Sequence, residues 1–247
     1  MRCAFVIPLY NHKATLATVV ERAREVGYPI IIVDDGSTDG GGELADQLEG
    51  VEQVIHHGEN RGKGAALISG MEAAAELADW AISVDSDGQH DPRDAPGLVA
   101  AIPDGERPIV IGARRGMDPG KSVPWTSRFG RKFSNFWIWA AGGHLVSDSQ
   151  SGFRVYPLPE TIALRPRSRH FQYEVELLVL ARWQGLPVVE APVTVHYEPK
   201  GKRISHFQPW QDFWRNSWAF SRLITARILI GRGARARRAL PGKGEEG

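Results

Sequence analysis

The sequence predicts an α/β protein, with a mixed sheet flanked by helices and an amphipathic helical appendage near the C-terminus. Over residues 1–112, short β-branched runs alternate with helical segments, as in consecutive βαβ units. Each predicted strand ends in polar or turn-forming residues. Hydrophobic residues make up 42% of the 247-residue chain, enough for one sizeable core. Because ligands of open α/β sheets bind beyond the carboxyl ends of the strands, we expect the functional groups to gather at one edge.

Hydrophobic periodicity and turn residues locate the individual elements. Strands are expected at 4–7, 30–34, 53–56, 80–85 and 109–112, with helices near 14–26, 42–48, 63–77 and 95–102. Further along, we expect a helix at 173–183, strands at 187–190 and 193–196, and then a long helical region rich in tryptophan and arginine.

Charge is distributed unevenly along the chain. Residues 200–247 contain 11 Lys/Arg and 3 Asp/Glu, whereas residues 1–199 contain 19 and 26. A basic end on an acidic body favours an anionic membrane surface as partner and argues against nucleic acid. The single cysteine, Cys3, excludes an internal disulfide and fits a reducing compartment. Pro8 ends the first apolar run far short of a signal-peptide core, so we expect a cytoplasmic protein.

The predicted fourth strand ends in two carboxylates, Asp85 and Asp87, with Ser86 between them and Gln89 close behind. A departing pyrophosphate carries concentrated negative charge, and a divalent cation held by such oxygen ligands would stabilise it. The plain alternative is an acidic turn, since Asp is common where strands end.

Two other loops strengthen the first interpretation. In the loop 34–39, Asp35 could accept a hydrogen bond from a nucleobase, while Ser37 and Thr38 are better explained as an N-cap for the next helix. The loop 60–64 resembles a phosphate cradle but lacks the spacing of a Walker loop.

Taken in order, the motifs 7–11, 34–39, 62–64 and 85–89 resemble the family-2 glycosyltransferases, which have the GT-A fold. Within that family the chain is most similar to the dolichyl- and polyprenyl-phosphate sugar synthases. That similarity lies in the segments 112–114, 151–154 and 171–174, and the whole resemblance covers about residues 3–205.

The resemblance implies a role for each matching position. Nucleotide-sugar contacts would come from Pro8, Tyr10, Asn11, Asp35, Lys63, Asp85, Ser86 and Arg203. Asp87 and Gln89 would hold Mg2+ or Mn2+, and Arg114 and Arg128 would attract the acceptor phosphate, since guanidinium groups bind phosphate bidentately. His12 stands where many lipid-phosphate synthases carry an acidic residue, so the donor sugar stays open.

The implied reaction is a direct displacement that inverts the anomeric carbon, with Asp87, Arg114, Asp148 and Glu174 as the catalytic set. A phosphate acceptor requires no protein base. An alcohol acceptor would require a carboxylate, and Asp148 is preferred over Glu174 for that task. Glu174 and Glu176 fall two apart on a predicted helix, so one of them is expected to be an ordinary solvated residue.

The expected organisation is a GT-A domain over 1–205, divided into a nucleotide-sugar half (1–115) and an acceptor half (116–205). An amphipathic membrane-interface region at 206–232 and a disordered basic tail at 233–247 would follow. The aromatic residues Phe133, Phe136, Trp137 and Trp139 fit either core packing or a bilayer interface.

Two other functions compete with this one. A sugar-phosphate nucleotidyltransferase would also use metal-binding carboxylates on an α/β domain, but the chain lacks a Gly-rich basic loop after its first strand. A noncatalytic, membrane-recruited nucleotide-sugar-binding protein would retain the same motifs without turnover. The sequence leaves the sugar, the lipid and the oligomeric state open.

Overall fold

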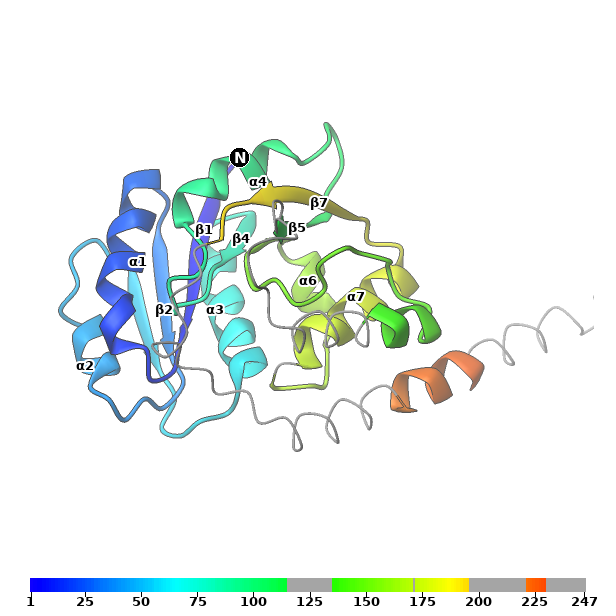
Figure 1. The fold of residues 1–247 in the computed structure, drawn as a ribbon, viewed down its shortest axis with the longest axis horizontal. Coiled ribbons are helices and arrows are strands. Elements are labelled where there is room, and N and C mark those ends of the chain that lie inside the picture. Colours follow the sequence, from blue (N-terminus) through cyan, green and yellow to red (C-terminus); the bar gives the residue numbers. More distant parts are fainter. Residues whose placement is uncertain (115–134, 171, 196–220, 230–247) are drawn as a thin grey trace, which may run out of the picture.

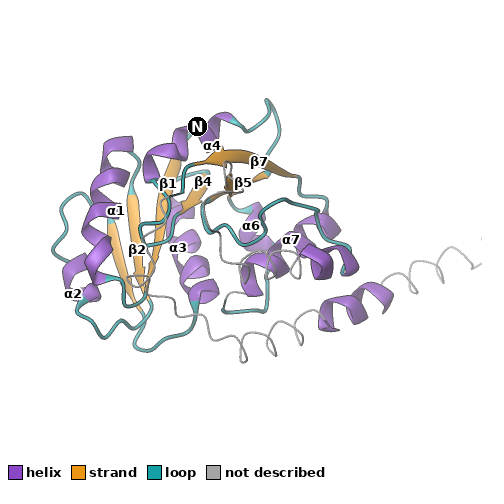
Figure 2. Ribbon diagram, in the orientation of Figure 1, coloured by secondary structure: helices purple, strands orange, loops and turns teal. Residues whose placement is uncertain are grey.

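A computed structural model describes residues 1–114, 135–170, 172–195 and 221–229. Its centre is a seven-stranded sheet with the order β3-β2-β1-β4-β6-β5-β7 (Figures 1 and 2). The strands are β1 (Cys3–Leu9), β2 (Ile30–Asp34), β3 (Gln53–His56), β4 (Trp80–Ser83), β5 (Ile109–Arg114), β6 (Arg154–Pro157) and β7 (Val188–Val193). The strands β1 to β4 pair in parallel, β6 runs antiparallel between β4 and β5, and β7 is parallel to β5. The mixed α/β sheet is therefore confirmed.

Helices cover both faces of the sheet (Figure 2). They are α1 (Lys13–Val26), α2 (Gly41–Ala45), α3 (Lys63–Leu77), η1 (Pro92–Asp94), α4 (Ala95–Ala100), α6 (Glu160–Ala163) and α7 (Gln172–Gln184). Residues 135–140 and 221–229 are also helical. Within the described ranges, no helix combines the length and the apolar character needed to cross a membrane.

The apolar strands are continuous in sequence because both faces of the sheet are buried. In β1, Ala4 and Val6 join the core under α3 and α7, whereas Phe5, Ile7 and Leu9 join the core under α1, α2 and α4. A Cβ added to Gly70 of α3 would lie 2.3 Å from Val6 Cγ1. This glycine lets α3 pack closely on β1. The first turn of α3 then lies near the edge where the parallel strands end.

Most of the expected elements are confirmed, and three expectations are wrong. The strands expected at 187–190 and 193–196 are the single strand β7, which continues through Pro192 because an edge strand tolerates a residue without an N–H. Ser37 and Thr38 do not cap a helix, since the N-cap of α2 is Gly40. Glu176 is not solvated: it is 3% exposed.

Candidate active site

The site lies at the carboxyl ends of β1, β4 and β5, where the loop 148–153 and the first turns of α3 and α7 meet it (Figure 1). Its centre is Lys63, the first residue of α3. The Lys63 Nζ lies 2.7 Å from Asp85 Oδ1 and 3.0 Å from Glu174 Oε1. The sequence-predicted residues Lys63, Asp85 and Glu174 thus form one ion-paired cluster.

The charges of this cluster stabilise one another. Burial disfavours the Lys63 ammonium, but Asp85 and Glu174 outweigh that effect and raise the pKa of Lys63. Burial likewise disfavours the charged form of Asp85, yet the adjacent Lys63 lowers the pKa of that carboxyl below its usual value. Lys63 is therefore protonated and Asp85 ionised at neutral pH.

Gly152 leaves room for the cluster. A Cβ added there would lie 2.2 Å from Asp85 Oδ2 and 2.7 Å from Lys63 Nζ. The Ser83 hydroxyl donates a 2.7 Å hydrogen bond to the Gly152 carbonyl, which fixes the Gly152 backbone next to Asp85 and Lys63. Only glycine permits this approach without displacing the carboxylate.

Arg114 and Asp148 form a bidentate ion pair. Arg114 Nε lies 2.5 Å from Asp148 Oδ2, and a terminal guanidinium nitrogen lies 2.8 Å from Oδ1. Glu190 of β7 orients this pair, because its carboxylate accepts from the backbone N–H of Ser147 at 2.8 Å and of Asp148 at 3.3 Å. The Asp148 side chain is 3% exposed, so both of its oxygens are committed to Arg114 and shielded from water.

Asp35 is buried and anchors the loop that precedes α3. Its carboxylate accepts from the backbone N–H of Gly62 at 2.7 Å and of Arg61 at 3.0 Å, and it lies 2.7 Å from His57 Nδ1. The second ring nitrogen of His57 is 3.1 Å from Ser69 Oγ. The contacts of Asp35 therefore place Lys63, whereas its expected contact with a nucleobase stays a prediction.

The first two loops are tied together by Asn11. Its backbone has a positive φ of 54°, its N–H donates to Ser37 Oγ, and its side-chain oxygen accepts from Thr38 N–H at 2.7 Å. Pro8 is a buried residue of β1 that pairs in register with Val33. Tyr10 is the first residue after β1 and is partly exposed. These contacts explain the serine and threonine of the second loop better than capping does.

The acidic loop after β4 turns tightly. Gln89 N–H donates to Asp87 Oδ1 at 3.0 Å, Gly88 has a φ of 73°, and Thr15 Oγ1 donates to the Ser86 carbonyl at 2.6 Å. No cluster of three or more His, Cys, Asp or Glu side chains suited to a metal occurs in the described part of the chain. Asp87 and Gln89 still fit a nucleotide-bound Mg2+ or Mn2+, because such an ion takes one or two protein ligands and the rest from phosphate and water.

The helix α7 carries two buried carboxylates. Glu174 contacts Lys63, whereas Glu176 accepts from the backbone N–H of Ser168 at 2.8 Å and from Arg222 at 2.5 Å. A charged pair and a backbone donor compensate the burial of Glu176, which explains why it is not solvated.

Two contributors to the site were given no role by the sequence, although Arg154 lies in the segment 151–154 that carries part of the resemblance. Arg154 is fully buried and donates to the carbonyls of Ser149, Ser151 and Glu174, so it holds the loop against α7. His90 is buried beside Phe153, and burial lowers the pKa of this histidine. Arg128 and Arg203 lie outside the described residues.

The fold is a mixed α/β sheet with charged side chains gathered at the carboxyl ends of its strands, and comparisons with known proteins identify the class. Residues 4–160 match the family model described as Glycosyl transferase family 2. The chain is 32% identical over 212 residues to a UDP-N-acetylglucosamine–dolichyl-phosphate N-acetylglucosaminyltransferase of Methanococcus voltae, covering 78% of this chain and 84% of that protein. It is 31% identical to the polyprenol monophosphomannose synthase of Mycolicibacterium smegmatis, covering 78% and 77%.

A solved structure supports the same fold. Mannosyl-3-phosphoglycerate synthase from Rubrobacter xylanophilus superposes with a TM-score of 0.62 at 19% identity, covering all of this chain and 78% of that one. The chain belongs to glycosyl transferase family 2 and is a glycosyltransferase.

Proposed function

We propose that the protein transfers a sugar from a UDP- or GDP-sugar to polyprenyl phosphate with inversion at the anomeric carbon. One relative named above is a dolichyl-phosphate N-acetylglucosaminyltransferase and the other a polyprenol monophosphomannose synthase, and both names support this acceptor class. The observation that carries the proposal is that both candidate bases, Asp148 and Glu174, are held in ion pairs. Asp148 is bound bidentately by Arg114, and Glu174 is bound by Lys63. A phosphate acceptor needs no base, so this arrangement favours phosphate over alcohol.

The donor would lie over the loops after β1, β2 and β4. In this proposal Pro8, Tyr10 and Asn11 border the nucleoside together with Asp35. Asp85 and Ser86 face the ribose and the diphosphate. A divalent cation at Asp87 and Gln89 would supply positive charge to the departing diphosphate. Arg203 would add a further cation there.

The acceptor phosphate would lie against Arg114, with Arg128 as a second cation. Asp148 holds the guanidinium by two hydrogen bonds, which fix the orientation of the Arg114 guanidinium at this edge of the site. A phosphate oxygen attacks the anomeric carbon while the bond from that carbon to the diphosphate oxygen breaks. The electron pair of that bond leaves with the nucleoside diphosphate.

The setting would be the cytoplasmic face of a membrane, in the synthesis of cell-envelope glycans. In this proposal residues 1–205 form the catalytic domain and residues 206–232 an amphipathic region at the bilayer interface. The basic end of the chain, with 11 Lys/Arg against 3 Asp/Glu over 200–247, supports attraction to anionic lipid.

The test compares undecaprenyl phosphate with undecaprenol as acceptors, in detergent, with UDP-N-acetylglucosamine and GDP-mannose as donors and Mg2+ or Mn2+ present. We expect release of nucleoside diphosphate with the phosphate alone, and loss of release in Asp87→Ala but not in Asp104→Ala. Asp104 is an exposed residue in the loop before β5 and serves as the matched control. Equal use of undecaprenol would refute the phosphate acceptor. Pyrophosphate release from a nucleoside triphosphate would instead indicate a nucleotidyltransferase, and donor binding without turnover would indicate a binding protein.

A further inference from the structure

Exposed apolar side chains gather in two segments that pack against each other. Of the seven large hydrophobic side chains that are exposed in the described part of the chain, five lie in two segments, 136–145 and 228–229. These five are Phe136, Trp139, Leu145, Ile228 and Leu229, between 49% and 71% exposed. An exposed group of this kind indicates an interaction surface.

The two segments lie side by side because helix 221–229 is docked onto helix 135–140. Leu223 is buried in the core that also contains Ile138, and Arg227 donates a 2.7 Å hydrogen bond to the Ala140 carbonyl. Trp183 of α7 donates to the next carbonyl, that of Ala141, at 3.2 Å. These donors satisfy carbonyls at the end of helix 135–140 and fix the relative position of the three helices.

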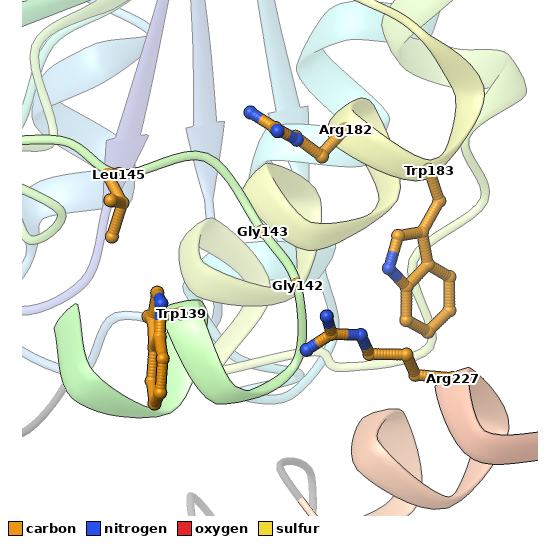
Figure 3. A pocket seen from close by; sticks show the side chains of 7 residues that line it. All are labelled: Trp139, Gly142, Gly143, Leu145, Arg182, Trp183 and Arg227. Atoms are coloured by element: carbon orange, nitrogen blue, oxygen red, sulfur yellow. The ribbon is translucent and has the colours of Figure 1, made fainter. Parts of the chain in front are cut away.

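Between the three helices lies a pocket of about 630 Å³. It is lined by Trp139, Gly142, Gly143, Leu145, Arg182, Trp183 and Arg227. Figure 3 shows Trp139 and Leu145 on one side of the pocket, Trp183 and Arg227 on the other, and Arg182 above. A Cβ at Gly142 would lie 2.8 Å from Arg227 Nε, so glycine allows the guanidinium to lie against the wall.

Among the described residues, no carboxylate forms an ion pair with the positively charged side chains of the pocket. The segments that form it, 135–146, 177–186 and 221–229, contain no Asp or Glu. The one other arginine of the third segment, Arg222, is paired with Glu176. Among the described residues, neither Arg182 nor Arg227 forms an ion pair with an acidic side chain, and both are exposed. Arg227 uses one N–H for the Ala140 carbonyl, and a guanidinium has five.

We propose that this pocket binds the head-group phosphate of an anionic phospholipid, while the surrounding apolar side chains enter the bilayer interface. Guanidinium groups bind phosphate bidentately, and tryptophan beside arginine is typical of protein surfaces at the head-group level. The charge selects an anionic lipid over a neutral apolar partner. This inference rests on the membrane association proposed above and gives it a defined contact surface.

The test measures binding of the full chain to sedimented vesicles of phosphatidylcholine, with and without phosphatidylglycerol. Each cation close to an anionic surface contributes about fivefold to binding, so Arg182→Gln/Arg227→Gln should weaken binding to phosphatidylglycerol vesicles about 30-fold. The control Arg2→Gln/Arg24→Gln removes the same charge from exposed positions elsewhere and should bind like the wild type. Trp139→Ser should weaken binding to both kinds of vesicle. Arg227 donates to the Ala140 carbonyl at the end of helix 135–140, whereas Arg182 makes no hydrogen bond to that helix end among the described residues. The single variant Arg182→Gln therefore separates an effect on lipid binding from an effect on folding.

Three results would overturn the proposal. They are equal binding of the wild type to both vesicle types, wild-type binding by the double variant, and loss of self-association rather than of vesicle binding in Trp139→Ser. The last result would assign the surface to a second copy of the chain. Transfer to a short, water-soluble polyprenyl phosphate should be unchanged in all these variants. Vesicle binding without any such transfer would refute the proposed function and leave the lipid pocket standing.

Discussion

Replacing Gly152 by alanine should disable the enzyme while leaving it folded. The added Cβ would lie 2.2 Å from Asp85 Oδ2, whereas ordinary contacts of this kind begin near 3.4 Å, so the carboxylate must retreat by about 1.2 Å. Asp85 cannot do so without stretching its 2.7 Å contact with Lys63, which itself would lie 2.7 Å from the new methyl group.

The size of the effect follows from this displacement. Shifting a positioned group by about 1 Å can cost about 100-fold in rate, and we expect a loss of that order in nucleoside diphosphate release. The extra methyl group should lower the free energy of unfolding by only about 1–3 kcal/mol, because the colliding atoms belong to side chains that can move.

The assay measures donor turnover at saturating undecaprenyl phosphate, alongside urea unfolding of each variant. Gly97→Ala is the control, since Gly97 is exposed in α4 and a Cβ there meets no atom within 4 Å. Wild-type turnover in Gly152→Ala would refute the reasoning, because it would mean that the position of Asp85 does not matter. Loss of the cooperative unfolding transition would show instead that the glycine serves the fold.

Three further predictions use other parts of the structure. Asp148→Asn should raise KM for undecaprenyl phosphate at least as much as it lowers kcat, because it releases Arg114; a large fall in kcat without a change in KM would point to a base. The hydrogen bond to Asp46, opposed by burial and aided by Asp34, raises the pKa of His56. The protonated ring therefore stabilises the fold at pH values below the ordinary pKa of histidine, and this stabilisation is lost as the pH rises through the raised pKa of the folded state. His56→Asn should therefore lower the urea midpoint more near about pH 6 than near about pH 9, and an equal loss at both would contradict the ion pair. EDTA should abolish diphosphate release and added Mg2+ or Mn2+ should restore it, whereas activity that persists in EDTA would exclude the metal role.

The sequence predicted β1, β2, β4 and β5 well because each of these strands contains an apolar run followed by polar or turn-forming residues. It missed β6, whose four residues begin with Arg154 and end with Pro157. Nothing local distinguishes this segment from a loop. It becomes a central strand because β4 and β5 leave a gap that an antiparallel strand fills on both sides. Such a position is decided by tertiary pairing.

The same limit applies to the site. Sequence motifs located Asp85, Lys63 and Arg114, since each lies at the end of a strand or the start of a helix. They could not show that Arg114 meets Asp148, 34 residues away, or that Glu174 meets Lys63. The expectation for Glu176 failed because helical spacing assigns faces without saying what packs on them. The second face of α7 turned out to be covered as well.

The balance of charge among these pairs gives an independent reason to expect a divalent cation. The described site residues include three cations, Lys63, Arg114 and Arg154, and at least four carboxylates: Asp85, Asp87, Asp148 and Glu174. Lys63 and Arg114 are each matched by at least one of those carboxylates, and the fully buried Arg154 donates to backbone carbonyls, so the pairs leave no excess of positive charge for an incoming ligand. A nucleoside diphosphate sugar and a polyprenyl phosphate both bring further negative charge to the same edge. Unless positive charge enters with them, repulsion would oppose the approach of the acceptor to the donor. A divalent ion held at Asp87 would supply that charge beside the donor diphosphate, so donor affinity itself should fall when the metal is removed.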